Sequence, residues 1–193
     1  MVEIVREALK GGASMIQYRY KSGNMPRIAE TLRALTDITR FYNVPLIVND
    51  YVEIAKETGA DGVHLGQGDM SPAKAREVLG GEAIIGVTAF EPAHFEALDL
   101  AVVDYAGTGP VYETKTDKGK PVLGPEGLEA LVDLSPVPVV GVGGITPGNA
   151  AAVIEAGADG VAMMRAVSEA ADPQKAAYDF LNVVAATRLR EVS

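Results

Sequence analysis

A short phrase that occurs three times constrains the fold more than any other feature of this sequence. It reads EALKGGASMIQ at residues 7–17, AKETGADGVHL at 55–65 and VIEAGADGVAM at 153–163. In each copy an amphipathic helical stretch ends at a glycine, which can adopt the left-handed conformation that closes many helices, and an apolar strand follows. These glycines are Gly11, Gly59 and Gly157. The phrase predicts a repeated unit of helix, tight loop and strand.

Between these units lie four further apolar runs, which read VPLIVND, AIIGVTA, DYAGTGP and PVPVVGVGGI. Each run is too short for a helix, and its bulky apolar residues are nearly continuous rather than alternating with polar ones. Strands that are buried on both faces have this composition, and such strands usually belong to parallel sheets. Together with the three strands of the repeated phrase, they predict seven parallel strands.

Helical segments fill the intervals between the strands. We expect helices at residues 2–10, 26–42, 51–58, 71–79, 92–99, 125–134, 147–156 and 173–190. Several have a clear start signal, which is a capping residue followed by proline at the first helical position. These capping residues are Ser71, Thr146 and Asp172.

The regular alternation of seven strands with eight helices is typical of one α/β architecture. It predicts a (β/α)₈ TIM barrel that lacks its first β-strand, with residues 1–193 as a single domain. An open doubly wound sheet is the alternative, but no G-x-G-x-x-G sequence follows a strand and opens a helix. Seven strands leave two unpaired edges. Loss of a first strand, a rearrangement or pairing with another chain would each account for them. The sequence therefore does not decide whether the chain forms a homo-oligomer.

Composition excludes several classes of function. With 48% apolar and 22% charged residues, the chain has the composition of a soluble globular protein. No apolar stretch approaches the roughly 20 residues that cross a bilayer, and MVEIVREALK lacks the pattern of a signal peptide, so we expect a cytoplasmic protein without membrane contact. A net charge of -9 argues against nucleic-acid partners. An anionic substrate would therefore need a local basic cluster or a metal ion.

The active site of a TIM barrel lies at the carboxyl ends of its strands, so the residues that follow each apolar run are the candidates. Gln17, Arg19 and Lys21 alternate along an extended segment and project to one side, where two cations could hold phosphate. An exposed basic edge is the alternative. The other residues in such positions are Asn49, Asp50, His64, Gln67, Asp69, Thr88, Thr108, Thr114, Thr116, Gly143, Gly144 and Arg165.

Two carboxylates in this set follow neighbouring strands. Asp50 comes after LIVN, and Asp69 comes shortly after GVHL. Parallel strands place such ends close together, and one or two carboxylates with phosphate and water suit Mg²⁺. The pair therefore predicts an Mg²⁺ ion bound to a diphosphate. For each residue taken alone, the alternative is capping of the helix that follows.

The stretch VGVGGITPGN predicts a second anion site. Gly143 and Gly144 let backbone N–H groups approach a phosphate, assisted by the start of the next helix. Met164 and Arg165, at the end of the last strand, would form the other half, since phosphate sites after the last two strands are common in this fold. A plain turn is the alternative.

The two histidines are interpreted differently. His64, inside GVHL, is either an inward-facing site residue or a core histidine, whereas His94, in EPAHFEAL, is expected on a helix surface. No Ser–His–Asp set and no His-rich metal cluster is evident in the sequence.

Taken together and in this order, QYRYK, VNDYVEIA, GADGVHLGQGD, IIGVTA, GTGPVYETKT and VGVGGITPGN resemble the motifs of the thiamine phosphate synthase family over essentially the whole chain. The resemblance implies a transferase that joins a pyrimidine diphosphate, 4-amino-2-methyl-5-(diphosphooxymethyl)pyrimidine, to a thiazole phosphate. The products are thiamine phosphate and pyrophosphate. It implies Mg²⁺ as the cofactor, and a dissociative substitution that needs little acid–base chemistry.

The resemblance also implies a role for individual residues. The pyrimidine diphosphate would be bound by Gln17, Arg19, Lys21, Asn49 and Thr88, with Arg19, Lys21 and Thr88 acting on the reacting group. The Mg²⁺ ligands would be Asp50 and Asp69. The thiazole phosphate would be bound by Thr114, Thr116, Gly144, Met164 and Arg165.

The chain departs from the family pattern at three points. Asp117 stands where the family usually has lysine after the second threonine of this loop, with Lys115 and Lys118 on either side. Arg165 stands where a small hydroxyl residue is common, and the first strand is missing. We expect these departures to affect catalytic turnover more than substrate binding.

Several alternatives to the synthase stay open. Thiazole tautomerase, a related isomerase with the same barrel, tends to lack the metal carboxylates and has a catalytic histidine where this chain has Pro110, so the residues favour the synthase. A noncatalytic phosphate-binding barrel is a second alternative, and another phosphate-handling barrel isomerase is a third.

Overall fold

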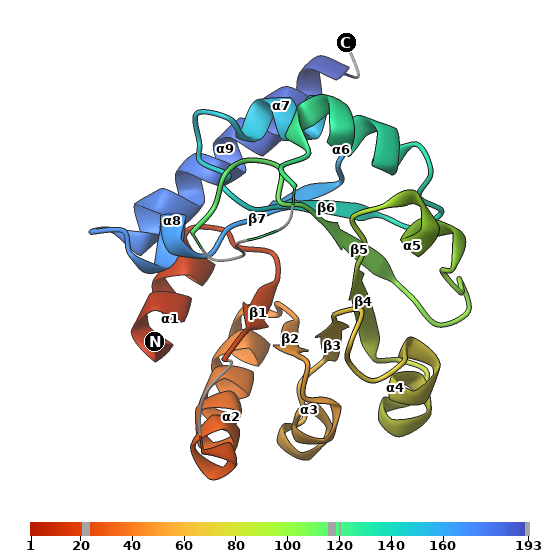
Figure 1. Cartoon of the computed structure of the whole chain (residues 1–193). Helices are drawn as coiled ribbons and strands as arrows, with labels where there is room; N and C mark the ends of the chain where they lie inside the picture. The colour runs from red at the N-terminus through yellow and green to blue at the C-terminus, as the bar shows by residue number, and fades with distance from the viewer. Residues whose placement is uncertain (21–23, 116–118, 120, 192–193) are drawn as a thin grey trace.

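The structure is a computed structural model that describes residues 1–20, 24–115, 119 and 121–191. It contains a seven-stranded parallel sheet in the order β1-β2-β3-β4-β5-β6-β7, so each strand pairs with the next one along the chain. The strands are β1 (Ile16–Tyr18), β2 (Leu46–Asn49), β3 (Gly62–Leu65), β4 (Ile84–Thr88), β5 (Tyr105–Thr108), β6 (Val139–Val142) and β7 (Gly160–Ala162). Figure 1 shows that the sheet curls around an axis and carries the helices on its outer side. The predicted barrel without one strand is confirmed.

All eight expected helices are present in the described residues. They are α1 (Val2–Lys10), α2 (Met25–Tyr42), α3 (Val52–Thr58), α4 (Pro72–Leu79), α5 (Pro92–Glu96), α6 (Gly124–Val132), α7 (Ala150–Glu155) and α9 (Pro173–Glu191). A short helix that the sequence did not predict, α8 (Arg165–Ser168), follows β7. Helix α5 ends earlier than expected because Asp99 starts a turn, in which its Oδ1 accepts a hydrogen bond from Ala101 N.

Two of the three predicted helix starts are confirmed. Ser71 Oγ accepts from Lys74 N at 3.4 Å, and Asp172 Oδ1 accepts from Lys175 N at 2.9 Å. The start predicted at Thr146 is wrong, because α7 begins only at Ala150. The residues between them form a turn, in which Asn149 Oδ1 accepts a 2.7 Å hydrogen bond from Thr146 N.

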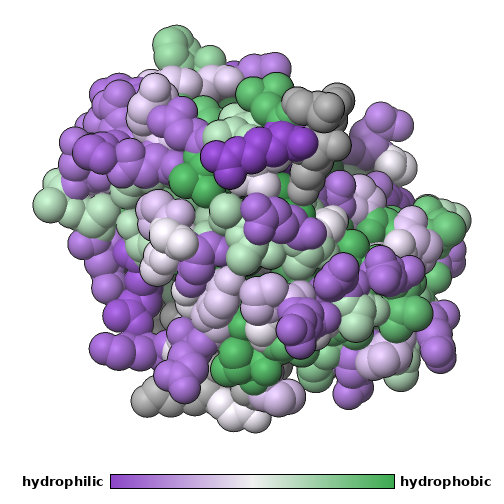
Figure 2. All heavy atoms as spheres, turned by 90° about the horizontal axis from the view of Figure 1, so that it is seen from above, coloured by the Kyte–Doolittle hydropathy of each residue, from purple (hydrophilic) through white to green (hydrophobic). Residues whose placement is uncertain are grey.

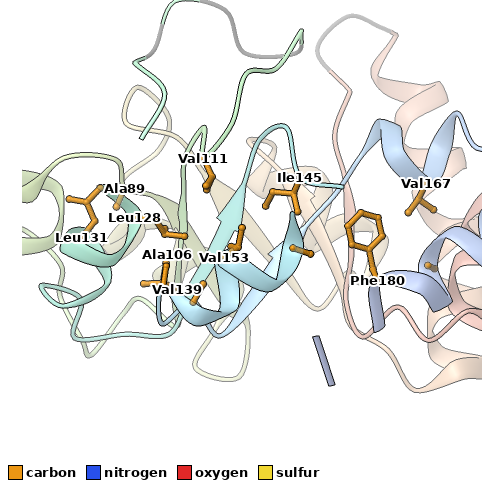
Figure 3. Close-up of a cluster of buried hydrophobic side chains, with 14 of the residues drawn as sticks. Ala89, Ala106, Val111, Leu128, Leu131, Val139, Ile145, Val153, Val167 and Phe180 are labelled. Atoms are coloured by element: carbon orange, nitrogen blue, oxygen red, sulfur yellow. The ribbon is translucent and has the colours of Figure 1, made fainter. Parts of the chain in front are cut away.

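Side chains of the strands alternate between the helices and the inside of the curled sheet. The helix-facing residues divide the core in two. The first half packs β2, β3 and β4 against α2, α3 and α4, and its fully buried side chains include Leu32, Leu35, Leu46, Val48 and Val63. In the second half, Ala106 and Val139 of the sheet meet Leu128 of α6 and Val153 of α7 (Figure 3). Burial of each large apolar side chain contributes about 1.5–3 kcal/mol to folding, so these two clusters fix the positions of the strand ends.

The sheet is open between β1 and β7, which do not pair with each other in the described residues. The helical layer nevertheless continues across this opening, because the end of α1 packs on α9. A side chain at Gly11 would overlap the backbone oxygen of Gln174, and one at Gly12 would lie 2.5 Å from Leu181. The left-handed conformation predicted at Gly11 is wrong, since its φ is -77°. Gly12 has that role instead, with φ +93°.

The aspartates that precede three strands explain part of the repeated phrase. Asp61, just before β3, accepts a 2.8 Å hydrogen bond from Leu46 N at the start of β2. Asp159, just before β7, does the same for Val139 N of β6, and Asp104 does so for Ile85 N of β4. Each carboxylate satisfies a backbone N–H at the amino end of the neighbouring strand. The other glycines of the phrase are as predicted, with positive φ at Gly59 and Gly157.

The face of the molecule seen from above (Figure 2) carries mainly polar side chains. The face shown in Figure 2 has small, separate apolar patches between hydrophilic residues. Isolated apolar residues of this kind are normal on a protein surface. In the part of the chain that the structure describes, no helix is both long and apolar enough to cross a membrane.

Candidate active site

A row of paired residues crosses the inner face of the sheet, from the carboxyl end of β2 to the amino end of β5. The parallel register aligns Asn49 with His64, His64 with Gly86, and Gly86 with Tyr105. Residues in register on neighbouring strands point to the same side, so the row runs from β2 to β5 inside the curled sheet. Gly86 is required here, because any side chain at that position would overlap the Tyr105 ring.

His64 is at the centre of this row, where it is buried on the inner face of the sheet. Its Nδ1 lies 3.0 Å from Tyr105 Oη, and its Nε2 lies 3.0 Å from Thr88 Oγ1. Burial lowers the pKa of His64 to about 4, with the Asp69 carboxylate raising the pKa and the Arg19 guanidinium lowering it further. The ring is therefore neutral at pH 7, with one N–H donor and one acceptor nitrogen.

Gln17 and Asn49 form an amide pair on the first two strands. Gln17 Nε2 donates to Asn49 Oδ1 at 2.7 Å. This leaves the Asn49 amide N–H and the Gln17 carbonyl oxygen without another hydrogen-bond partner among the described residues. Arg19, directly after β1, is partly exposed and makes no hydrogen bond within those residues. It lies two residues after Gln17, on the segment that continues β1.

The two aspartates predicted as metal ligands lie in the segments that follow β2 and β3. Asp50 has φ +68°, which is uncommon for a residue other than glycine, and its backbone N–H donates to His64 O. Asp69 is exposed, and its Oδ2 accepts a 2.7 Å hydrogen bond from Gly66 N. Helix α4 has Ser71 as its cap, and α3 has Tyr51 at its N-cap position. The capping alternative for Asp69 at α4 is therefore wrong.

Thr88 ends β4 and is held on two sides. Its hydroxyl meets His64, and its carbonyl oxygen accepts a 2.6 Å hydrogen bond from Gln67 Nε2. Thr108, at the end of β5, differs from the expectation that it faces the site. Gly107 faces inward toward His64, so Thr108 points to the helices. It is fully buried there, and its Oγ1 has no hydrogen-bond partner among the residues that the structure describes.

The glycine pair after β6 packs closely against the loop that follows β5. Gly143 and Gly144 have φ of +93° and +66°. A side chain at Gly144 would lie 2.5 Å from Glu113 O and 2.7 Å from Tyr112 Cβ. Tyr112 N also donates to Gly143 O at 3.0 Å. This contact joins the two loops predicted to bind one phosphate.

Asn149 holds the glycine turn in shape. Its Nδ2 donates to Gly144 O at 3.2 Å, while its Oδ1 accepts from Thr146 N. Met164 and Arg165 follow β7, as predicted, and both are exposed. Arg165 Nε lies 3.0 Å from Glu169 Oε1, so the guanidinium already has a carboxylate partner one helical turn away.

Part of the predicted site lies outside the described residues. This applies to Lys21 and Thr116, and also to Asp117 and Lys118. Thr114 and Lys115 are described and belong to the loop after β5. Among the described residues, no group of three or more His, Asp or Glu side chains could hold a metal ion. Protein side chains of the described residues alone therefore form no complete metal site, and a metal held by Asp50 and Asp69 stays a prediction.

Comparisons with known proteins identify the family of the chain. Residues 1–167 match the family described as thiamine monophosphate synthase. The chain belongs to this family. A thiamine-phosphate synthase of Xanthobacter autotrophicus is 43% identical over 190 residues, which cover 97% of this chain and 90% of the relative.

Solved structures give the same result for the family and the fold. A thiamine phosphate pyrophosphorylase from Pyrococcus furiosus matches with a TM-score of 0.88 and 36% identity, covering 96% of this chain and 90% of that one. Orotidine 5'-phosphate decarboxylase from Pyrococcus horikoshii matches with a TM-score of 0.70 at 16% identity, over 95% and 92% of the two chains. The second likeness shows only the shared barrel fold. The family resemblance inferred from the motifs is confirmed.

Sequence reasoning missed two residues that shape the site. Tyr105 lies in an apolar run, and its position beside His64 depends on the glycine one strand away. Asn149 follows the glycine turn within VGVGGITPGN, where an asparagine at the end of a turn could have indicated the hydrogen bonds that it makes to Thr146 and Gly144. His94 is also more covered than expected, since its side chain is only 15% exposed and pairs with Glu91.

Proposed function

We propose that the chain is a thiamine-phosphate synthase, which joins 4-amino-2-methyl-5-(diphosphooxymethyl)pyrimidine to a thiazole phosphate and releases pyrophosphate. Membership of the family and the likeness to named synthases support this function. One observation from the site carries it further. The amide pair of Gln17 and Asn49 and the hydrogen bond between His64 and Thr88 lie on the same inner face of the sheet. Arg19 follows β1 and Asp69 follows β3 at the strand ends beside them.

The pyrimidine diphosphate would occupy the side of the pocket formed by β1 to β4. The Asn49 amide N–H and the Gln17 carbonyl oxygen, which have no other partner among the described residues, offer one donor and one acceptor. These match a ring nitrogen and the amino group of an aminopyrimidine. Arg19, Lys21 and the Thr88 hydroxyl would hold the diphosphate. A planar guanidinium suits phosphate oxygens because it can donate two parallel hydrogen bonds.

The donor set fits Mg²⁺. Asp50 and Asp69 supply hard oxygen ligands from neighbouring strand ends, and Mg²⁺ usually takes only one or two carboxylates together with water and substrate phosphate. A third protein carboxylate is therefore not needed. When bound, the ion would stabilise negative charge on the departing pyrophosphate.

The thiazole phosphate would occupy the opposite side, between the loop after β5 and the glycine turn after β6. Thr114, Thr116 and Gly144 belong to these two segments, and the backbone N–H groups at Gly143 and Gly144 can face an anion because both residues have positive φ. Met164 and Arg165 would complete this site after β7. Arg165 could bind phosphate only by giving up or sharing its pair with Glu169.

The proposed reaction exchanges one bond at the pyrimidine methylene carbon. The bond to the diphosphate oxygen breaks, both electrons leave with pyrophosphate, and the ring nitrogen of the thiazole forms the new C–N bond. Arg19 and Thr88 would stabilise the charge that develops on the leaving oxygen atoms. No proton transfer is required at this carbon, which agrees with a neutral, hydrogen-bonded His64.

The tautomerase alternative is less well supported. The comparisons name synthases, and Pro110 occupies the position expected for a tautomerase histidine. We further propose that residues 1–193 act as one domain, because the strands that would bind the two substrates belong to the same sheet. Formation of a homo-oligomer is also a proposal, supported by the unpaired edges of β1 and β7.

A coupling assay tests the function. The chain is mixed with both substrates and with Mg²⁺, and thiamine phosphate and pyrophosphate are measured separately. We expect equal amounts of the two products, and none when either substrate is left out. Failure of a folded chain to form thiamine phosphate under these conditions would contradict the proposal, while binding of the thiazole phosphate alone would favour a noncatalytic phosphate-binding barrel.

A further inference from the structure

Three side chains on the inner face of the sheet form a continuous hydrogen-bonded chain. Tyr105 Oη lies 3.0 Å from His64 Nδ1, and His64 Nε2 lies 3.0 Å from Thr88 Oγ1. The three residues come from β5, β3 and β4, so this series of hydrogen bonds connects the interior of the sheet to its carboxyl edge. Tyr105 is only 8% exposed, whereas Thr88 at the other end is partly exposed.

The two rings fit into space that neighbouring glycines leave open. A Cβ at Gly86 would overlap the Tyr105 ring, and a Cβ at Gly107 would lie 2.9 Å from His64 Cε1. The Thr88 backbone is fixed separately, by the hydrogen bond from Gln67 to its carbonyl oxygen. Packing therefore holds all three groups in their mutual positions.

The direction of the hydrogen bonds follows from the buried tyrosine. A phenol hydrogen needs an acceptor, and His64 Nδ1 is the hydrogen-bond partner of Tyr105 Oη within the described residues. If Nδ1 carried the imidazole hydrogen, the Tyr105 hydroxyl hydrogen would be buried without an acceptor, which costs about 1–3 kcal/mol. Tyr105 therefore donates to Nδ1, and the imidazole hydrogen is on Nε2.

This direction determines what Thr88 can offer to a ligand. Nε2–H donates to Thr88 Oγ1, so the threonine hydroxyl accepts inside the protein and keeps its own O–H for a partner in the site. Phosphate oxygens of a diphosphate accept hydrogen bonds only, and therefore require a donor. With the opposite direction, Thr88 would use its only hydrogen on His64 and would present a lone pair to the anion.

We propose that Tyr105 is a positioning residue, which sets the tautomer of His64 and so makes the Thr88 hydroxyl a hydrogen-bond donor to the diphosphate group. This role of Tyr105 rests on the proposed function, because the diphosphate is that of the pyrimidine substrate. The role of Tyr105 and the proposed function can fail separately, since the tautomer and the binding of inorganic pyrophosphate can be measured without turnover.

The first measurement is the ¹⁵N NMR spectrum of the His64 ring in the unmodified chain at pH 7, assigned with a His64→Gln variant. We expect the hydrogen on Nε2 and an unprotonated Nδ1. A ring with its hydrogen on Nδ1 would overturn the proposal, whether or not the chain forms thiamine phosphate.

The second measurement is the affinity for inorganic pyrophosphate in the presence of Mg²⁺. Thr88→Val and Tyr105→Phe should each weaken binding by about five- to tenfold, the size expected for loss of one hydrogen bond, whereas Thr88→Ser should restore it. The double variant should bind no more weakly than Thr88→Val, because both changes act through one hydroxyl. Tyr178→Phe, on the exposed part of α9, is the matched control and should bind normally.

Additive losses in the double variant would overturn the proposal, and so would normal pyrophosphate affinity in Tyr105→Phe. Thermal unfolding of each variant is measured in parallel. A purely structural role for Tyr105 would lower the unfolding temperature, but it would not make the loss of affinity depend on whether residue 88 carries a hydroxyl.

Discussion

The side-chain amide of Gln17 donates a 2.7 Å hydrogen bond to Oδ1 of Asn49, across the inner face of the first two strands. This bond orients both amides, because each has a nitrogen and an oxygen end that could otherwise exchange places. Within the described residues, the orientation leaves one donor and one acceptor without another partner. We therefore predict that these two residues recognise the pyrimidine ring rather than the diphosphate.

Replacement of Asn49 tests that role. Asn49→Asp keeps an acceptor for Gln17 but removes the amide N–H, so we expect kcat/KM for the pyrimidine diphosphate to fall by about 10- to 100-fold. The affinity for the thiazole phosphate should not change. Asn182→Asp, on the exposed face of α9, introduces the same charge as a control. Equal activity of the two variants in steady-state kinetics would exclude Asn49 from substrate recognition.

Burial of His64 predicts a specific dependence of stability on pH. The pKa of His64 is lowered from 6.5 to about 4 in the folded chain, so below about pH 6.5 the unfolded state binds a proton that the folded state does not. The free energy of unfolding should therefore decrease by about 3 kcal/mol as the pH falls from about 6.5 to about 4, and this contribution should then level off. His64→Gln should lack it. Urea denaturation of the unmodified chain and of His64→Gln measures the free energy of unfolding at each pH. Contributions from titrating carboxylates are the same in both proteins and cancel in the difference between them. If this difference does not change with pH, His64 is not buried in its neutral form.

The sequence predicted most of the fold because its signals are local. Helix caps such as Ser71 and Asp172 depend on the next few residues, and continuous apolar runs identify buried strands without reference to other parts of the chain. The start predicted at Thr146 failed because Asn149 offers a competing local hydrogen bond. The position of Gly11 failed for a different reason, since packing against α9, a distant segment, decides its conformation.

The candidate site was predictable as a set of strand ends, but not in its internal contacts. The rule that sites lie at the carboxyl edge identifies Arg19, Asn49 and Thr88 as candidates. The contact between His64 and Tyr105 depends on a side chain that is absent at Gly86, and no local pattern reports it. The inward or outward direction of Thr108 likewise follows from the register of the sheet, which a short run alone does not fix.

Arg76 is predicted to be a main stabilising residue at the amino ends of β4 and β5. Its side chain is 18% exposed and donates to Gly81 O, to Val102 O at 2.8 Å and to Asp104 Oδ2 at 2.9 Å. Arg76→Met should lower the free energy of unfolding by about 3 kcal/mol, because the partners lose their donors. Arg76→Lys should recover only part of this, since one ammonium cannot reach separate acceptors.

The control for Arg76 is an arginine with a similar pairing but a different environment. Arg33 pairs with Glu57, and both side chains are more than half exposed. Arg33→Met should change the free energy of unfolding by less than about 1 kcal/mol, as for other exposed ion pairs. Chemical denaturation compares the two arginines directly. Similar decreases in the free energy of unfolding for both variants would show that Arg76 is no more stabilising than an exposed arginine.

Gly144 should be intolerant of any side chain. Gly144→Ala would place a Cβ 2.5 Å from Glu113 O, at a residue with φ +66°, so the turn must shift and move its N–H groups. We expect the KM for the thiazole phosphate to rise at least about tenfold, with about 1–3 kcal/mol lost in stability. Gly81→Ala, where nothing lies within 4 Å, is the control. An unchanged KM in Gly144→Ala would remove the glycine turn from the phosphate site.

Asp50 and Asp69 are proposed to hold the Mg²⁺ that supports coupling of the two substrates, and the Mg²⁺ dependence of thiamine phosphate formation tests this role. The rate is measured over a series of Mg²⁺ concentrations for the unmodified chain, Asp50→Asn, Asp69→Asn and the exposed control Asp37→Asn. We predict that the unmodified chain and Asp37→Asn saturate at the same Mg²⁺ concentration. Asp50→Asn and Asp69→Asn should need at least about tenfold more Mg²⁺ or lose coupling, while still binding the thiazole phosphate. Coupling that proceeds without Mg²⁺, or the same Mg²⁺ dependence in all four proteins, would show that Asp50 and Asp69 do not hold a catalytic Mg²⁺.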